Sequence, residues 1–379
     1  MERMDIFAGQ LASLAEAGRL RALAPRLGRD FSSNDYLGLA GDPAIGRAVA
    51  EAVARGVPAG SGGSRLLRGN HPEHEALEGK AAVFFGTEAA LYFSSGFGAN
   101  MALFATLPQS GDLVVADELV HASAHEGLRR GRAEHRFAAH NDANAFADTI
   151  AQWRATGGRG RVWIAFETVY SMEGDVAPID ELAAIARAED GWLLIDEAHA
   201  TGLYGPGGRG LAAHLDGADN VVSLHTCGKG LGVEGALVCA PRLIIDFLVN
   251  RARSFIFSTA PSPLMAVAVR AALDRCAEGD DLRGRLDGLR NHAGTMLGAR
   301  FGLPAPASQI IPFILGGERR TMAAAHALRA GGFDVRGIRP PTVPDGTSRL
   351  RISLTLNVGT SDIDDLAEAL AEALEGVPA

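Results

Sequence analysis

Apolar residues gather in six short runs within the first two thirds of the chain. Almost every position in a run is apolar, which is typical of strands buried on both faces of a sheet. The runs cover residues 90–95, 112–117, 161–167, 192–197, 220–226 and 235–240. Helical stretches such as residues 179–190 alternate with some of these runs, so the pattern predicts an α/β fold with a mostly parallel central sheet and helices on both faces.

The last run breaks the parallel arrangement. Residues 235–240 follow residues 220–226 after a glycine-rich connection that is too short to hold a crossover helix. Two parallel neighbours need such a crossover. We therefore expect one antiparallel strand, which a plain dinucleotide-binding fold does not have.

From about residue 262 the pattern predicts a smaller α+β domain. Its expected elements are a long helix through Cys276, a helix over 322–329, strands over 333–338 and 349–355, and a closing helix over 362–374 that Thr360 or Ser361 starts. The expected division is an N-terminal helical segment (1–35), a large domain (36–261) and a small C-terminal domain (262–379).

Composition and charge disfavour some classes of function. The 379 residues are 47% hydrophobic and 21% charged, as expected for a packed chain, and the formal net charge is −9. This charge disfavours nucleic acid and anionic membranes as partners. No apolar run reaches the roughly 20 residues of a membrane span, and the first residues lack the apolar centre of a signal peptide, so we expect a cytoplasmic protein. The three scattered cysteines have neither disulfide nor metal spacing.

The letters DEAH at 196–199 raise the possibility of an ATP-driven motor. Such a protein needs a preceding G-x-x-x-x-G-K-[ST] loop to hold phosphate and magnesium. The chain has none: CGKGLG at 227–232 comes after Asp196 and has Gly230 where the hydroxyl should stand. Another role for Asp196 is needed.

Two histidine pairs raise the possibility of a metal site. HPEH (His71 and His74) and HASAH (His121 and His125) have spacings that place two imidazoles on one helix face. HASAH lacks the neighbouring glutamate of zinc proteases, and no third ligand is evident. We expect no metal, and such pairs are more often surface or capping histidines.

Lys229 stands among Gly228, Gly230 and Gly232. By itself it could be a solvated lysine in a flexible loop. However, a lysine that forms a Schiff base needs a short, unobstructed loop in which a flat ring can approach the backbone. Pyridoxal phosphate also needs a carboxylate at its ring nitrogen, and Asp196 at the end of a buried strand suits that role.

The phosphate of such a cofactor needs the N-terminus of a helix. Residues 92–107 predict strand, turn and helix in that order, with Gly96 and Phe97 at the helix start, where N–H groups favour an anion. An ordinary strand-to-helix turn is the alternative. His121 is a candidate for stacking on the ring, and a helix-cap histidine is the alternative for it.

Over nearly its whole length the chain resembles the α-oxoamine synthases. These are pyridoxal-phosphate enzymes of the aspartate aminotransferase fold type (fold type I transferases) that condense an amino acid with an acyl thioester and release CO2. The motifs that carry the resemblance are SSNDYLGLA, GSGGSRLLRGNHPEHEALE, YFSSGFGAN, DELVHAS, ETVYSMEGD, DEAHATGLYGPGGRG, HTCGKGLGVEGA and IRPPTVPDGTSRLRISLT. Together they are specific, whereas any one of them would be weak.

The resemblance implies a role for each matching residue. Lys229 is the expected Schiff-base lysine, Asp196 the partner of the pyridine nitrogen, His199 a donor to the ring hydroxyl, and His121 the stacking group. The remaining expected contacts are Gly96, Phe97 and Thr226 at the phosphate, Ser171 beside the ring, Ser258 and Thr259 at the phosphate of the neighbouring subunit, and Asn34, Thr342 and Arg351 at the substrate. An arginine suits a carboxylate because its planar fork matches it.

The resemblance also implies the reaction and the partners. Motifs such as GGSR and the segment 338–355 favour L-alanine and a pimeloyl thioester as substrates, the chemistry of biotin synthesis, in a homodimer with shared active sites. The alternative is glycine with acetyl-CoA, or another α-oxoamine synthase reaction with a different acyl thioester. The donor is either an acyl-CoA or an acyl-carrier protein. A non-catalytic subunit would be expected to lack Lys229, and a pyridoxal-phosphate-sensing regulator would need a basic DNA-binding domain that this chain does not have.

Overall fold

The computed structural model describes residues 2–23 and 25–376, which form two compact units. The large unit holds Asp35–Ser171 and Asp175–Gly284, and the small unit holds Met1–Asn34, Met172–Gly174 and Arg285–Ala379. This division differs from the expected one at two places. The N-terminal segment belongs to the small unit because β1 (Arg29–Asp30) pairs with β10 (Phe333–Asp334). The boundary lies near residue 285 because α10 (Pro263–Ala277) packs on α2 (Pro43–Ala54) and α3 (Pro72–Phe85) of the large unit.

A seven-stranded sheet forms the centre of the large unit, in the order β2-β8-β7-β6-β5-β3-β4. Its strands are β2 (Ala89–Phe93), β3 (Leu113–Asp117), β4 (Glu134–Ala138), β5 (Val162–Glu167), β6 (Trp192–Asp196), β7 (Val221–Thr226) and β8 (Ala236–Ala240). β8 is antiparallel to both of its neighbours, and every other adjacent pair is parallel. The predicted sheet with one antiparallel strand is confirmed.

β4 is the strand that the apolar pattern did not predict. Its sequence EHRFA is mostly polar, and most of its residues are exposed or half-buried. Because β4 lies at the edge of the sheet, only part of it needs to be apolar.

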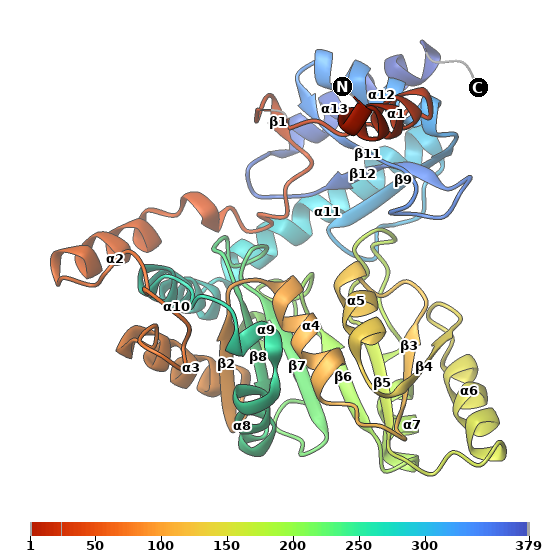
Figure 1. Cartoon of the computed structure of the whole chain (residues 1–379). Helices are drawn as coiled ribbons and strands as arrows, with labels where there is room; N and C mark the ends of the chain where they lie inside the picture. The colour runs from red at the N-terminus through yellow and green to blue at the C-terminus, as the bar shows by residue number, and fades with distance from the viewer. Residues whose placement is uncertain (1, 24, 377–379) are drawn as a thin grey trace. The chain divides into compact units, whose positions relative to one another are not determined.

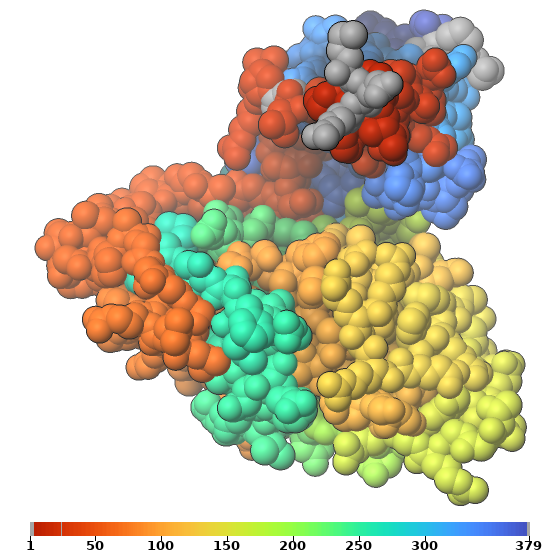
Figure 2. Space-filling model, viewed as in Figure 1, coloured from red at the N-terminus to blue at the C-terminus, as the bar shows by residue number. Residues whose placement is uncertain are grey.

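Helices cover both faces of this sheet (Figure 1). One apolar cluster joins the sheet to α4 (Gly96–Thr106), α5 (Ala122–Arg130) and α8 (Arg242–Arg251). A second cluster joins the other face to α6 (Ala143–Ala155) and α7 (Ile179–Ala188). In the space-filling view α4, α5 and α8 hide most of the sheet behind them (Figure 2). The unit also contains α9 (Arg253–Ile256) and the 3-10 turns Leu39–Gly41 and Pro206–Gly208. The predicted helix at 179–190 corresponds to α7.

The small unit contains an antiparallel three-stranded sheet in the order β11-β12-β9, the parallel pair β1-β10, and helices (Figure 1). Its other elements are α1 (Glu2–Glu16), α11 (Asp280–Phe301, which starts in the large unit), β9 (Ile310–Gly316), α12 (Glu318–Ala330), β11 (Arg336–Ile338), β12 (Ser348–Ser353) and α13 (Thr360–Glu375). No helix in the described residues is both long and apolar enough to span a bilayer.

Three details of the small unit differ from the sequence prediction. The expected strand over 333–338 is divided between β10 and β11, which belong to different sheets. The edge strand β9 was not predicted; it contains Pro312, a residue that edge strands tolerate and that weakens the strand signal. The cap residue of α13 is Gly359 rather than Thr360 or Ser361, and its N–H donates to the Asp362 carboxylate at 2.8 Å.

Candidate active site

The carboxyl ends of β3, β5, β6 and β7 lie side by side, because these strands are parallel. We call the side of the large sheet formed by these strand ends its carboxyl edge. Asp117, Glu167, Asp196 and Thr226 are the last residues of these four strands. Glu167 and Asp196 are direct partners in the register of β5 and β6. Polar side chains that lie far apart in the sequence are thereby gathered at a single edge.

Asp196 is half-buried and accepts two hydrogen bonds. Its Oδ1 accepts the backbone N–H of Ala198 at 2.9 Å, and its Oδ2 accepts the side-chain amide of Asn100 at 2.8 Å. Both donors fix the direction of the carboxylate. Asn100 was not among the predicted site residues, although it is the only polar residue within the interior of the apolar helix α4.

His121 is the N-cap residue of α5, so the capping alternative of the sequence analysis describes it correctly. Its Nδ1 accepts the backbone N–H of Ser123 at 3.2 Å and lies 2.8 Å from the Ser123 hydroxyl. The residue remains exposed, and a stacking role is compatible with its cap position. Burial of part of the ring lowers the pKa of His121, against the opposing effect of Asp196.

The start of α4 is closely packed on the end of β7. A Cβ atom added to Gly96 would lie 2.6 Å from Cγ2 of Thr226, so a side chain here would collide. Ser95 caps the helix by accepting the N–H of Gly98 at 3.1 Å. The first turn of a helix carries N–H groups without intrahelical partners, which makes this a suitable place for a phosphate. Gly96 and Thr226 are brought together, and Phe97 stands beside them with 47% of its surface exposed.

Lys229 lies half-buried in a tight loop between β7 and β8. The loop is closed by the N–H of Gly232, which donates to the Lys229 carbonyl at 2.9 Å, and by that of Val233, which donates to the Cys227 carbonyl at 2.8 Å. Glycines are required here: Gly232 has φ 67°, and a Cβ at Gly230 would lie 2.3 Å from the Thr201 carbonyl oxygen. The glycines thus let the loop pack closely against the backbone of Thr201.

His199 lies just after β6 and is 4% exposed. Its Nδ1 is 2.7 Å from the hydroxyl of Tyr36, which is fully buried. Tyr36 belongs to the NDYLG motif but was not assigned a role from the sequence. The pair holds the imidazole ring of His199 in one orientation.

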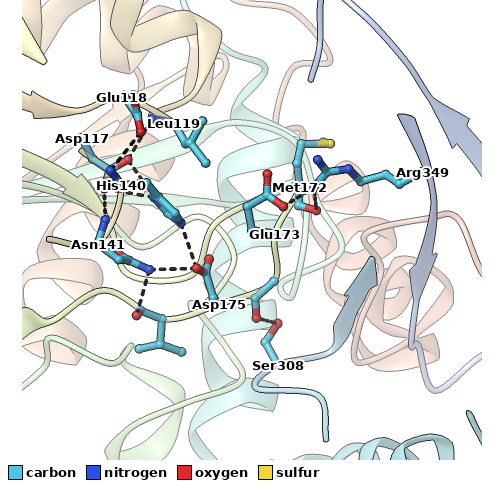
Figure 3. Close-up of polar contacts among 12 residues, drawn as sticks. Asp117, Glu118, Leu119, His140, Asn141, Met172, Glu173, Asp175, Ser308 and Arg349 are labelled. Atoms are coloured by element: carbon cyan, nitrogen blue, oxygen red, sulfur yellow. Dashed lines mark hydrogen bonds and ion pairs between the residues drawn. The ribbon is translucent and has the colours of Figure 1, made fainter. Parts of the chain in front are cut away.

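Ser171 lies on a short hairpin whose sides are joined by the Val169–Val176 bridge. His140 holds the base of this hairpin, because its two ring nitrogens contact Asp117 at 2.9 Å and Asp175 at 2.8 Å (Figure 3). Burial opposes the charge on His140, but the hydrogen bonds that its ring donates to both aspartates outweigh this effect and raise the pKa of His140 to about 10. The imidazolium therefore stays charged between two carboxylates.

The tip of the hairpin, Met172–Gly174, belongs to the small unit. There Arg349 pairs with Glu173 and donates to the carbonyl of Met172 at 3.2 Å, while Ser308 donates to the carbonyl of Gly174 at 2.7 Å (Figure 3). The hairpin is thus held at its base and at its tip by different residues.

Glu167 is the buried carboxyl of this edge. It is 3% exposed, and its Oε1 has no hydrogen-bond partner among the described residues. Burial first, and the nearby Asp196 second, raise the pKa of Glu167 well above its ordinary value. Glu167 was not among the residues predicted from the sequence to lie in the site.

The remaining predicted residues lie elsewhere. Ser258 and Thr259 follow α9, with Thr259 exposed. In the small unit, Arg351 is 6% exposed and donates to Asn34 Oδ1 at 3.1 Å and to the Ser353 hydroxyl at 2.7 Å. Thr342 is exposed in the loop before β12, and its N–H donates to the Arg339 carbonyl at 3.1 Å. The structure therefore joins Arg351 to Asn34 but not to Thr342.

The polar groups at the carboxyl ends of the strands in the large unit fit pyridoxal phosphate. Asp196 offers a fixed carboxylate to a protonated ring nitrogen, Lys229 an amine in a glycine loop, and the start of α4 with Thr226 a cradle for a phosphate. Within residues 2–23 and 25–376 no group of three or more histidine, cysteine or acidic side chains could hold a metal ion.

The fold and this edge define a fold type I transferase. The chain belongs to the aminotransferase class I and II family, whose family model matches residues 29–370. A relative from Anaeromyxobacter dehalogenans named 8-amino-7-oxononanoate synthase is 41% identical over 99% of this chain and 97% of its own length. The predicted resemblance to the α-oxoamine synthases is thereby confirmed.

Two solved structures show the same fold. A structure of SPT with pyridoxal phosphate as an internal aldimine has a TM-score of 0.89 at 26% identity, covering 98% of this chain and 97% of the other. The 8-amino-7-oxononanoate synthase of Francisella tularensis has a TM-score of 0.76 at 26% identity, covering 92% of this chain and 98% of the other.

Proposed function

We propose that this chain is a pyridoxal-phosphate-dependent synthase that condenses L-alanine with a pimeloyl thioester. The products would be 8-amino-7-oxononanoate, CO2 and the free thiol, as one step of biotin synthesis. The observation that carries the proposal is that the chain has both Lys229 in its glycine loop and the carboxylate of Asp196, which accepts two hydrogen bonds. The relatives named 8-amino-7-oxononanoate synthase, which match nearly the full length of this chain, support the choice of substrates.

When bound, pyridoxal phosphate supplies an electron sink for negative charge at the α-carbon of the amino acid. Lys229 Nζ would hold the cofactor covalently and, as a free amine, would take the α-proton of alanine. Asp196 would keep the ring nitrogen protonated, and the donors Ala198 and Asn100 keep the Asp196 carboxylate aimed in one direction. His199, whose imidazole is fixed by Tyr36, would donate to the ring hydroxyl.

The first turn of α4, with Gly96 and Phe97, and the hydroxyl of Thr226 would bind the phosphate. His121 would cover one face of the ring, and Ser171 would lie beside it. Arg351, paired with Asn34, would grip the alanine carboxylate, since its planar fork forms two parallel hydrogen bonds. Thr342 would contribute from its exposed loop to the substrate site.

We propose that the active form is a homodimer in which Ser258 and Thr259 reach the phosphate of the neighbouring subunit. Large aromatic side chains near this segment support the assignment, because Phe97, Phe247 and Phe257 are 47%, 37% and 70% exposed. Exposed aromatics of this size are enriched in interfaces. We assign the enzyme to the cytoplasm, where its thioester donor is available as acyl-CoA or on an acyl-carrier protein.

Thiol release by the purified, cofactor-loaded protein tests the proposal. Alanine, glycine and serine would be combined with pimeloyl-, acetyl- and succinyl-CoA, and then with pimeloyl-carrier protein. Release with alanine and a pimeloyl donor only is the expected result, and the better donor identifies the carrier. Preferred release with glycine and acetyl-CoA would instead define a glycine C-acetyltransferase.

The Lys229→Ala variant is the control for this assay. We expect it to fold and to lose turnover, because no other amine replaces Lys229 Nζ. Turnover in this variant would end the proposed mechanism, whichever substrates the wild type uses.

A further inference from the structure

A continuous chain of hydrogen bonds joins Asp196 to His121. The side-chain amide of Asn100 donates to Asp196 Oδ2 at 2.8 Å and to the Ser123 hydroxyl at 3.0 Å, and this hydroxyl lies 2.8 Å from His121 Nδ1. Asn100 and Ser123 are 3% and 1% exposed. In the proposed mechanism Ser123 has no role and Asn100 serves only as a donor to Asp196, yet together they connect Asp196 to His121.

The orientation of the Asn100 amide follows from its partners. If the amide were turned over, its oxygen would face the Asp196 carboxylate, and two acceptors would repel each other. The nitrogen therefore faces Asp196 and uses its two hydrogens for two different acceptors. The Ser123 oxygen is one of these acceptors, so the single hydroxyl proton of Ser123 is available for His121.

This arrangement decides where the proton of His121 lies. His121 Nδ1 accepts the backbone N–H of Ser123 at 3.2 Å, so it carries no proton. The Ser123 hydroxyl donates to the same nitrogen. The imidazole is thus neutral, with its proton on Nε2, and the lowered pKa of His121 agrees with this state.

We propose that Asn100 is a positioning residue which, together with Ser123, holds Asp196 and His121 as one hydrogen-bonded unit and fixes the Nε2–H tautomer of His121. This inference rests on the proposed function, in which Asp196 meets the nitrogen of the cofactor ring and His121 covers the ring. The two groups are then oriented by a common buried pair, and a change in one is transmitted to the other.

The variants Ser123→Ala and Asn100→Asp test separately the bond from Ser123 to His121 and the two bonds of the Asn100 amide. Ser123→Ala removes the hydroxyl but keeps the bond from Asn100 to Asp196. Asn100→Asp keeps the shape of the side chain but removes the shared donor and places a second carboxylate beside Asp196. Asn220→Asp is the matched control, because among the described residues the Asn220 amide donates to the Gly191 carbonyl alone, at 2.8 Å, next to the amino end of β7.

The first readout is ¹⁵N NMR of histidine-labelled, cofactor-free protein, with the His121 signals assigned from a His121→Gln variant. In the wild type and in Asn220→Asp we expect Nδ1 to be unprotonated and Nε2 to be protonated. In Ser123→Ala and Asn100→Asp we expect the signals to move toward a mixture of tautomers, because the shorter hydroxyl bond at 2.8 Å is lost or redirected and the backbone N–H of residue 123, at 3.2 Å, is left to hold Nδ1. Protonated Nδ1 in the wild type, or identical signals in all four proteins, would overturn the proposal.

The second readout uses the loaded enzyme. We expect the pH dependence of the cofactor absorbance to shift in Asn100→Asp, and kcat to fall about tenfold in Ser123→Ala with a smaller change in KM, as is usual when a residue that orients an active-site group is removed. Unchanged spectra and rates in both variants would also overturn it. If the wild type binds no cofactor or releases no thiol, the proposed function fails, while the NMR experiment still decides the tautomer.

Discussion

The pairing of His140 with Asp117 and Asp175 makes the stability of this protein depend on pH. The pKa of His140 lies at about 10 in the folded protein and near its ordinary 6.5 in the unfolded chain. A raised pKa means that folding is favoured by the protonated form, so this contribution is fully present below pH 6.5. It decreases as the pH rises from 6.5 toward 10, where the folded imidazole also loses its proton.

The size of the effect follows from the same numbers. At about 1.4 kcal/mol per pH unit, the difference between the two pKa values corresponds to about 5 kcal/mol. The His140 side chain is 19% exposed and that of Asp175 is 39% exposed, so water screens part of this interaction. We expect His140→Gln to lower the free energy of unfolding by about 3 kcal/mol at pH 6, in the range for one partner removed from a buried ion pair.

Urea unfolding of wild type and variant at several values between pH 6 and pH 10 measures this difference. His214→Gln is the matched control, because His214 also contacts an aspartate, Asp180, at 2.9 Å, but both side chains are largely exposed. That control should change the free energy of unfolding by less than about 1 kcal/mol. The groups that face His140 are Asp117, Asp175 and the edge-on ring of Tyr170, and Glu118 accepts its backbone N–H.

The pH profile of the free energy of unfolding also depends on the charge of His140. The difference between wild type and His140→Gln should shrink as the pH approaches 10, because the wild type then loses its imidazolium. A difference that is no larger than that of His214→Gln, or that does not depend on pH, would refute the assignment of a charged His140 between two carboxylates.

Three other predictions concern the site. Asp196→Asn should bind some cofactor but lose most of its kcat, and an unimpaired rate would show that protonation of the ring nitrogen is unimportant. Arg351→Lys should raise KM for alanine at least about tenfold because a lysine cannot form the two parallel hydrogen bonds; an equal KM in steady-state assays would contradict its role. Gly230→Ala should lower the free energy of unfolding, measured by urea, by about 1–3 kcal/mol, because the new Cβ would lie 2.3 Å from the Thr201 carbonyl oxygen. In Gly79→Ala in α3 the new Cβ meets no atom within 4 Å, so this control should be neutral or stabilising.

Strands buried on both faces were readable from the sequence because their residues must be apolar at nearly every position. This requirement is strong in the middle of the sheet, at β5 and β6, and also at the fully buried edge strand β2, but it is weaker at the more exposed edge strands β4 and β9. The apolar pattern therefore did not predict β4, whose residues are mostly polar, or β9, which contains Pro312. It did not predict the division into units either, since the pairing of β1 with β10 joins segments about 300 residues apart.

The sequence by itself determined the chemistry of this protein. Lys229 among glycines, Asp196 at a strand end and the Gly96 turn are local patterns, and each requires its residue type at its place. Tertiary structure alone decided which side chains hold these groups in position. Asn100 reaches Asp196 across 96 residues and His140 reaches Asp175 across 35, and such bonds have no local sequence signal because only the folded chain brings donor and acceptor within 3 Å.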